Sequence, residues 1–247
     1  MNLILEVCAG SITSALNASK GGAHRVELCD NLSVGGTTPS PGIIRQAVSL
    51  LNIPVFVLVR PRAGDFLYSD DEFEAMKDDI LFCKDHGAEG VVLGLLKPDG
   101  TVDMERTGEL IRLARPMQVT FHRAFDMTPD AYQAMEDIIQ LGINRILTSG
   151  QAASALSGAD LIAELISIAD NRIIIMPGGG ISEENVTTLL NITHAKEVHA
   201  SLRSSVESAM QFKNVKSFMG KTGSDEYVWL ETDPEKVRRL LSKINPT

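Results

Sequence analysis

Three chemically active side chains follow one short apolar segment, Val119 to Phe121. The imidazole of His122, the guanidinium of Arg123 and the carboxylate of Asp126 come directly after it, and Thr128-Pro129-Asp130 then has the composition of a helix start. In a parallel sheet or barrel, ligands bind at the carboxyl ends of the strands. These residues therefore indicate either a ligand site or a structural ion pair that holds the loop in place.

A second polar group follows the apolar run that begins at Val55. Arg60-Pro61-Arg62 is followed closely by Asp65, which places two guanidiniums beyond the same strand. They could clamp a carboxylate or a phosphate, because a guanidinium binds such groups through paired hydrogen bonds. They could equally neutralise Glu27 and Asp65.

Pro177-Gly178-Gly179-Gly180 also follows an apolar run and leads into Ser182-Glu183-Glu184. Gly178 and Gly179 would let the backbone approach a ligand closely, and barrels often bind phosphate at this position. The alternative is a tight turn with Ser182 as the N-cap of a helix that begins at Glu183.

Two copies of a Glu-x-Cys pattern occur, Glu6-Val7-Cys8 and Glu27-Leu28-Cys29. Neighbouring strands lie about 4.8 Å apart, so both thiols could reach one metal, and paired thiolates favour Cu(I) or Zn(II). A closed zinc site is not expected, because no second cysteine pair or histidine pair accompanies them. The alternative is that both cysteines are simply small buried residues, as we expect for Cys83.

The elements that position these residues alternate between strand-length and helix-length segments about eight times along the 247 residues. We predict one α/β domain over residues 1–247, a single (β/α)₈ TIM-type barrel, with a doubly wound open sheet as the alternative. The barrel core covers about residues 1–202. Residues 203–247 form a C-terminal extension that ends in a helix starting at Thr232-Asp233-Pro234.

Strand side chains alternate between two faces, and the outer face of such a barrel must be apolar to pack against helices. This rule directs a ring of five ionisable side chains inward, at the carboxyl end of the barrel. The ring consists of Glu6, Glu27, Arg60, His122 and His199. Buried charges need partners, so the ring is either a self-satisfied network or a site that awaits a ligand.

Composition excludes several classes of function. The net charge of −9 argues against nucleic acid or an anionic membrane as the main partner. The N-terminus has no basic region typical of a signal peptide, and no apolar run reaches the roughly 20 residues of a membrane span. Three cysteines do not form a disulfide framework, which favours a reducing compartment.

The sequence resembles the CutC family of copper homeostasis proteins over nearly its whole length. The matching segments are Arg25–Cys29, Gly35–Ser40, Arg60–Ser69, Thr120–Asp126, Arg145–Gly150 and Glu197–His199. This resemblance implies a TIM barrel in the cytoplasm that takes part in copper handling, with Cu(I) bound at Cys8 and Cys29. It also implies a homo-oligomer.

Two functional hypotheses follow. The first is a cytoplasmic copper-binding protein that holds Cu(I) through Cys8 and Cys29. The second is an enzyme of unassigned reaction acting on a small anionic molecule, with His122 or His199 as acid or base and Glu6 or Glu27 as its partner. The ligand-binding candidates for that enzyme are Arg60, Arg62, Asp65, Arg123, Asp126, Gly178 and Gly179. The inward polar ring argues against a plain interaction scaffold.

Overall fold

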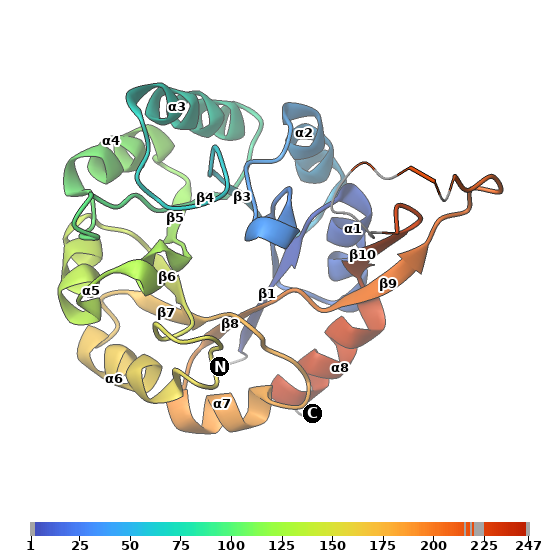
Figure 1. Cartoon of the computed structure of the whole chain (residues 1–247). Coiled ribbons are helices and arrows are strands. Elements are labelled where there is room, and N and C mark those ends of the chain that lie inside the picture. Colours follow the sequence, from blue (N-terminus) through green and yellow to red (C-terminus); the bar gives the residue numbers. More distant parts are fainter. Residues whose placement is uncertain (1–2, 215, 218, 220–224, 246–247) are drawn as a thin grey trace.

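A computed structural model describes residues 3–214, 216, 217, 219 and 225–245 (Figure 1). Eight strands form one parallel sheet, and helices alternate with them along the chain. The strands are β1 (Ile4–Ala9), β2 (Arg25–Leu28), β3 (Val55–Leu58), β4 (Gly90–Leu93), β5 (Gln118–Phe121), β6 (Arg145–Thr148), β7 (Ile174–Pro177) and β8 (Glu197–Ala200). The helices are α1 (Ile12–Gly21), α2 (Pro41–Leu50), α3 (Asp70–Asp85), α4 (Met104–Ala114), α5 (Ala131–Gln140), α6 (Ala159–Ala169) and α7 (Val186–Thr193).

The sheet curls into a barrel. Its strand order runs β7-β6-β5-β4-β3-β2-β1-β8, so each strand pairs with its sequence neighbour and β1 also pairs with β8. The two ends of this order, β7 and β8, meet through a single parallel bridge between Gly178 and His199. The helices surround the strands as a ring (Figure 1). The TIM-type architecture predicted from the sequence is therefore confirmed.

The predicted alternation of side-chain direction is also confirmed, because the apolar side chains separate into two clusters. The larger one fills the space between strands and helices and includes Val55, Val57 and Val59 of one strand run. The smaller one lies inside the barrel and contains the intervening Phe56 and Leu58, together with Cys8, Cys29 and Val92. Alternate side chains of the same strand thus pack in two different apolar clusters.

Below the inner apolar cluster, the barrel holds a buried ion-pair network that crosses from β2 to β8 and β6. Arg25 donates hydrogen bonds to both Glu6 and Glu197, the latter at 2.6 Å. Arg145 donates to the same Glu197 oxygen at 3.2 Å and to Gln118 at 2.8 Å. Both arginines stack over the ring of Phe56, with guanidinium-to-centroid distances of 4.8 and 5.0 Å. The network joins strands that are not neighbours in the sheet.

One predicted helix start is wrong by a few residues. The helix after the glycine-rich segment begins at Val186 instead of Glu183, because Ser182 and Asn185 close a separate turn through Asn185 N–H to the Ser182 carbonyl. After β5, residues Arg123–Met127 form a short 3₁₀ helix, η2, and α5 starts only after the Asp130 cap. A further 3₁₀ turn, η1 (Leu32–Val34), lies in the loop predicted between β2 and α2.

The C-terminal extension contains an antiparallel hairpin and a helix. The hairpin consists of β9 (Arg203–Glu207) and β10 (Val228–Thr232), which lie outside the ring beside α1 (Figure 1). Helix α8 (Pro234–Ile244) begins after the cap Asp233 as predicted, and it buries Val237 and Leu240. Among the described helices, none combines the length and apolar character needed to cross a bilayer.

We predict that Glu197→Ala destabilises the fold strongly. The substitution leaves the buried guanidiniums of Arg25 and Arg145 short of a counter-charge, and such a loss costs about 3–5 kcal/mol of unfolding free energy. Urea-induced unfolding would measure it. Glu136→Ala, which removes the partner of Arg172 from an exposed pair, should change stability far less. Equal effects of the two substitutions would contradict the structural role of the network.

Candidate metal centre and barrel-mouth cavity

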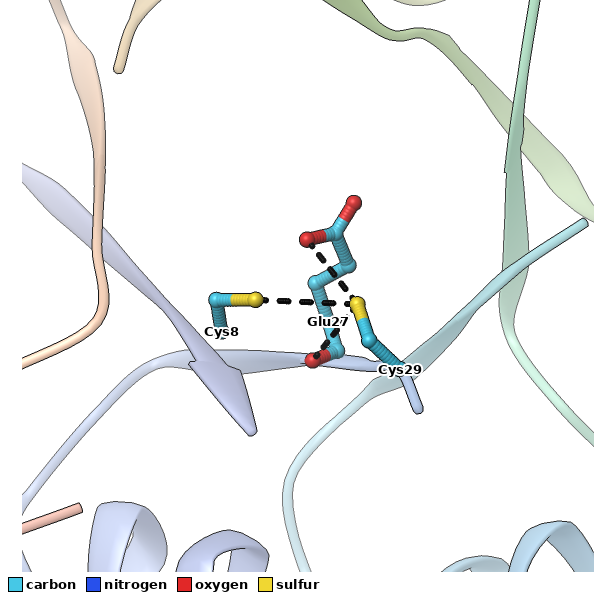
Figure 2. A group of neighbouring side chains, drawn as sticks. All are labelled: Cys8, Glu27 and Cys29. Carbon is cyan, nitrogen blue, oxygen red and sulfur yellow. Dashed lines mark hydrogen bonds between the residues drawn. The ribbon is translucent and has the colours of Figure 1, made fainter. Parts of the chain in front are cut away.

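The two predicted cysteines lie side by side at the carboxyl ends of β1 and β2. Cys8 is the register partner of Glu27, and Cys29 follows β2 by one residue. Their sulfur atoms are 3.6 Å apart, and Cys29 Sγ lies 3.4 Å from Glu27 Oε2 (Figure 2). Cys8, Glu27 and Cys29 are all buried and offer ligand atoms within 4.8 Å of one another. Strand pairing therefore brings Cys8 next to Cys29, from which it is separated by 21 positions in the sequence, and next to the neighbouring Glu27.

The proximity of the thiols makes their acidities unequal. The hydrogen bond from Cys29 holds the pKa of the Cys8 thiol at about 5, well below its ordinary value of 9.0. Burial, followed by the interaction with Cys8, raises the pKa of the Cys29 thiol well above that value. At neutral pH the pair thus carries one thiolate, on Cys8, and one thiol, on Cys29.

His199 and Glu6 complete the wall next to the thiols. Nδ1 of His199 is 2.8 Å from Glu6, and Nε2 is 3.6 Å from Glu27. Burial alone would raise the pKa of Glu6, but Arg25 and His199 outweigh it and bring the value to about 2. Burial would lower the pKa of His199, but Glu27, Cys8 and Glu6 raise it well above its ordinary value. Burial, together with the nearby Cys8 thiolate, raises the pKa of Glu27.

The donor set fits a soft metal ion. Two sulfurs 3.6 Å apart correspond to a bent sulfur–metal–sulfur angle of about 100° if each bond is about 2.3 Å, as in zinc thiolates. A linear two-thiolate arrangement would need the sulfurs about 4.6 Å apart, so each would move by about half an ångström. Sulfur donors select Cu(I) or Zn(II) over hard cations such as Mg²⁺.

Above the thiols lies a cavity of about 500 Å³ at the mouth of the barrel, within the size range of small-molecule sites. It brings together eight of the residues predicted to form a site. These are Cys8, Glu27, Arg60, His122, Arg123, Asp126 and His199, with Gly179 on the wall. The polar residues that the sequence placed at the barrel mouth thus line one continuous cavity.

His122 faces this cavity in an unusual state. Its Nδ1 accepts a hydrogen bond from the Ala124 N–H, so the ring proton is placed on Nε2. That Nε2 is buried and has no hydrogen-bond partner in the described part of the chain. Burial and the nearby charge of Arg60 lower the pKa of His122 to about 3. The imidazole is therefore neutral at physiological pH and can donate one hydrogen bond.

Arg123 and Asp126 form an ion pair that holds the loop in place, which is the alternative that the sequence offered to a ligand site. They pair at 2.8 Å, and the Asp126 carboxylate also accepts hydrogen bonds from Thr148 at the end of β6 and from Ser149 and Gln151 on the loop that follows. The pair therefore ties two neighbouring loops together. Because both residues also line the cavity, this structural role does not remove them from the wall.

Other predicted ligand contacts lie apart from the cavity. Arg62 pairs with Asp65 and with Glu72 at the capping box of α3, and neither Arg62 nor Asp65 contributes to the cavity wall. Gly178 forms the β7–β8 bridge, where an added Cβ would meet Leu147 at 2.4 Å. Gly178 therefore serves close packing, whereas Gly179 lies at the surface of the cavity.

The sequence prediction missed several residues of the candidate site and of the ion-pair network beneath it. Arg25 shares the inward face of its strand with Glu27 and Cys29, so the same alternation rule could have found it. Phe66 and Arg203 also line the cavity. Arg203 begins hairpin strand β9, whose position beside the barrel depends on packing between distant parts of the chain, and no local pattern reveals it.

A model of the CutC family matches residues 3–204. The chain belongs to the CutC family. A CutC family protein of Chromobacterium violaceum is 51% identical over 245 residues, which cover 99% of each chain. The human copper homeostasis protein cutC homolog is 50% identical over 238 residues, covering 96% of this chain and 87% of that protein.

Solved structures agree with this membership. The crystal structure of CutC from Streptococcus agalactiae has a TM-score of 0.78 and 36% identity to this CutC family chain, covering 81% of this chain and 98% of that one. A phosphoribosyl anthranilate isomerase from Thermotoga maritima has a TM-score of 0.57 at 16% identity, covering 99% and 100% of the two chains. The latter likeness concerns the barrel fold alone.

The unequal thiols can be tested directly. We predict that Cys29→Ala raises the pKa of Cys8 from about 5, because the hydrogen bond from Cys29 makes the largest contribution to its lowering and alanine has no donor to replace it. Ultraviolet absorbance of the thiolate during a pH titration measures this shift. Since the thiolate form exists above the pKa, the wild-type signal should persist down to about pH 5. Cys83→Ser, at a remote buried thiol, should leave the titration unchanged. An unshifted titration in Cys29→Ala would refute the coupling.

Proposed function

We propose that this protein takes part in copper homeostasis by binding Cu(I) as cargo through Cys8 and Cys29. The observation that carries the proposal is the 3.6 Å separation of two buried sulfur atoms at the end of a barrel. The mouse and human relatives are both named copper homeostasis protein cutC homolog, which supports copper as the metal. A reducing cytoplasm, expected from the sequence, would keep both thiols available.

The neighbouring groups are suited to this binding. Metal binding requires the remaining thiol to lose its proton. The Cys29 sulfur lies 3.4 Å from Glu27 Oε2, so this carboxylate, in its ionised form, is the acceptor within reach of that proton. Protonated His199 offsets the negative charge of two thiolates. The residues of this chain thus supply ligands, a proton acceptor and a counter-charge within one wall of the cavity.

The decisive experiment is a titration of the reduced protein with Cu(I) in the presence of a competing chelator. We expect one Cu(I) per chain, and an affinity at least about a hundredfold lower in the Cys8→Ser/Cys29→Ser double variant, because soft thiolates supply the selectivity. Cys83→Ser is the matched control, since it removes a thiol from helix α3 and should retain full affinity.

His122→Ala should also retain the affinity, because His122 belongs to the opposite wall of the cavity and is not among the three clustered donors. Binding that survives in the double cysteine variant would exclude the proposed site. Native mass spectrometry of the same samples gives the oligomeric state, so that the predicted homo-oligomer is tested together with the metal.

A second candidate function, catalysis on a small anionic molecule, is favoured by the geometry of His199. Its Nδ1 is fixed by the Glu6 carboxylate at 2.8 Å, and the ring lines the cavity. A carboxylate that orients an imidazole towards a ligand space is a common acid–base arrangement. Between the two predicted histidines, this favours His199 for proton transfer and leaves His122 as a neutral donor.

A screen for turnover of small organic anions would test this candidate. We expect any activity found to be lost in His199→Gln and kept in the double cysteine variant. Dependence on the cysteines but not on His199 would speak for the metal role alone.

A further inference from the structure

Three arginines are buried in the barrel, and they differ in how their charges are balanced. Arg25 pairs with Glu6 and Glu197, and Arg145 pairs with Glu197. Arg60 is equally buried, with 5% of its surface exposed, yet it forms no ion pair with the residues that the structure describes. Among the described residues, carboxylates thus pair with Arg25 and Arg145, and none pairs with Arg60.

Arg60 is held by neutral groups only. Its guanidinium donates to the main-chain carbonyls of Val34, Gly36 and Gly64 at 2.6–3.1 Å. Its Nε has no hydrogen-bond partner in the described part of the chain, and the ring of Phe66 lies 5.1 Å away. A buried charge without a counter-charge is costly, so an anion from outside the chain would be strongly favoured here.

A second unbalanced cation lines the same cavity. Arg203, from hairpin strand β9, forms no side-chain hydrogen bond or ion pair with any described residue. Arg123, in contrast, already has Asp126. Two uncompensated guanidiniums in one cavity stand out in a chain whose net charge is −9. The unpaired charge at the barrel mouth is thus positive, whereas the net charge of the whole chain is negative.

The wall also offers a neutral hydrogen-bond donor and an apolar surface. The ring of His122, whose Nε2 has no hydrogen-bond partner among the described residues, packs against Phe66 with ring centroids 4.9 Å apart. Leu58, Leu147 and Ile181 line the remaining wall. An occupant that matches this lining has an anionic group at one end and an apolar body, and a cavity of about 500 Å³ is large enough for such a molecule.

We infer that the barrel-mouth cavity binds a small organic anion, a carboxylate or a phosphate monoester, whose charged group is neutralised by Arg60 and Arg203 and whose oxygen accepts from His122. Binding of this anion requires neither Cu(I) nor turnover. It goes beyond the proposed metal site, and it supplies the binding half of the second candidate function without depending on a reaction.

The test uses the full reduced chain and three probes of similar shape. Benzoate, phenyl phosphate and benzyl alcohol are titrated by calorimetry, with thermal unfolding as a second readout. We expect at least one of the two anions to bind about tenfold or more tighter than the neutral alcohol, because hydrogen bonds to charged groups are the stronger ones. Which anion prevails distinguishes the carboxylate from the phosphate. Added salt should weaken binding of the anion only.

Matched arginine variants locate the site. Arg203→Gln should reduce anion affinity about tenfold while leaving the unliganded melting temperature unchanged, because Arg203 has no partner to lose. Arg62→Gln is the control, since Arg62 is already paired outside the cavity and should bind like the wild type. Arg60→Gln should lose most of the affinity for the anion. Because this substitution also removes three hydrogen bonds to loop carbonyls, the test of the site rests on the Arg203 variant.

The Cys8→Ser/Cys29→Ser variant separates this inference from the metal proposal. We expect it to keep its affinity for the anion or to bind it more tightly, because the variant removes a negative charge from the cavity wall, even if it binds no Cu(I). Two outcomes would overturn the anion site. One is that neither anion binds tighter than benzyl alcohol, and the other is that Arg203→Gln and Arg62→Gln bind the anion equally well.

Discussion

The Glu197 carboxylate, shared by two buried arginines, is the interaction on which the interior of this barrel depends. A closed parallel barrel leaves a narrow interior filled by side chains, and a charge placed there must find its counter-charge within a few ångströms. Arg25 and Arg145 enter from opposite sides and meet at Glu197. Buried pairs of this kind add little net stability, but they disfavour any strand register that would separate them.

The layer above follows from that lower layer. Because Arg25 holds Glu6 ionised, Glu6 can fix His199 at the level of the thiols. His199 in turn places a positive charge beside Cys8 and Glu27. The barrel interior therefore has three layers. The lowest contains the ion pairs of Arg25 and Arg145, the middle one contains the two thiols, and the open mouth contains arginines that are not all paired. Charge balance becomes less complete towards solvent, which is where a ligand can enter.

Much of this arrangement could be predicted from the sequence because it follows from period-two alternation. Val55 to Val59 and Glu27 to Cys29 reveal their faces without any structure, and the glutamate-cysteine pattern indicates the thiol pair. Arg62 and Arg60 look equivalent in the sequence, yet one pairs with α3 and the other enters the cavity. Only the path of the loop after β3 separates them. Arg203 depends on a hairpin that packs beside α1, a contact between ends of the chain that no local pattern encodes.

The bridge between Gly178 and His199 has a further consequence for dynamics. It is the one ladder contact that joins β7 to β8 in the described sheet, whereas the other neighbouring strands share several paired residues. His199 thus completes the ring of strands and also lines the cavity. A ligand that restrains His199 also stabilises the contact between β7 and β8. By linkage, formation of that contact must increase the affinity for the ligand to the same extent. Amide hydrogen exchange along β7 and β8 would therefore report on ligand binding at a distance from the ligand itself.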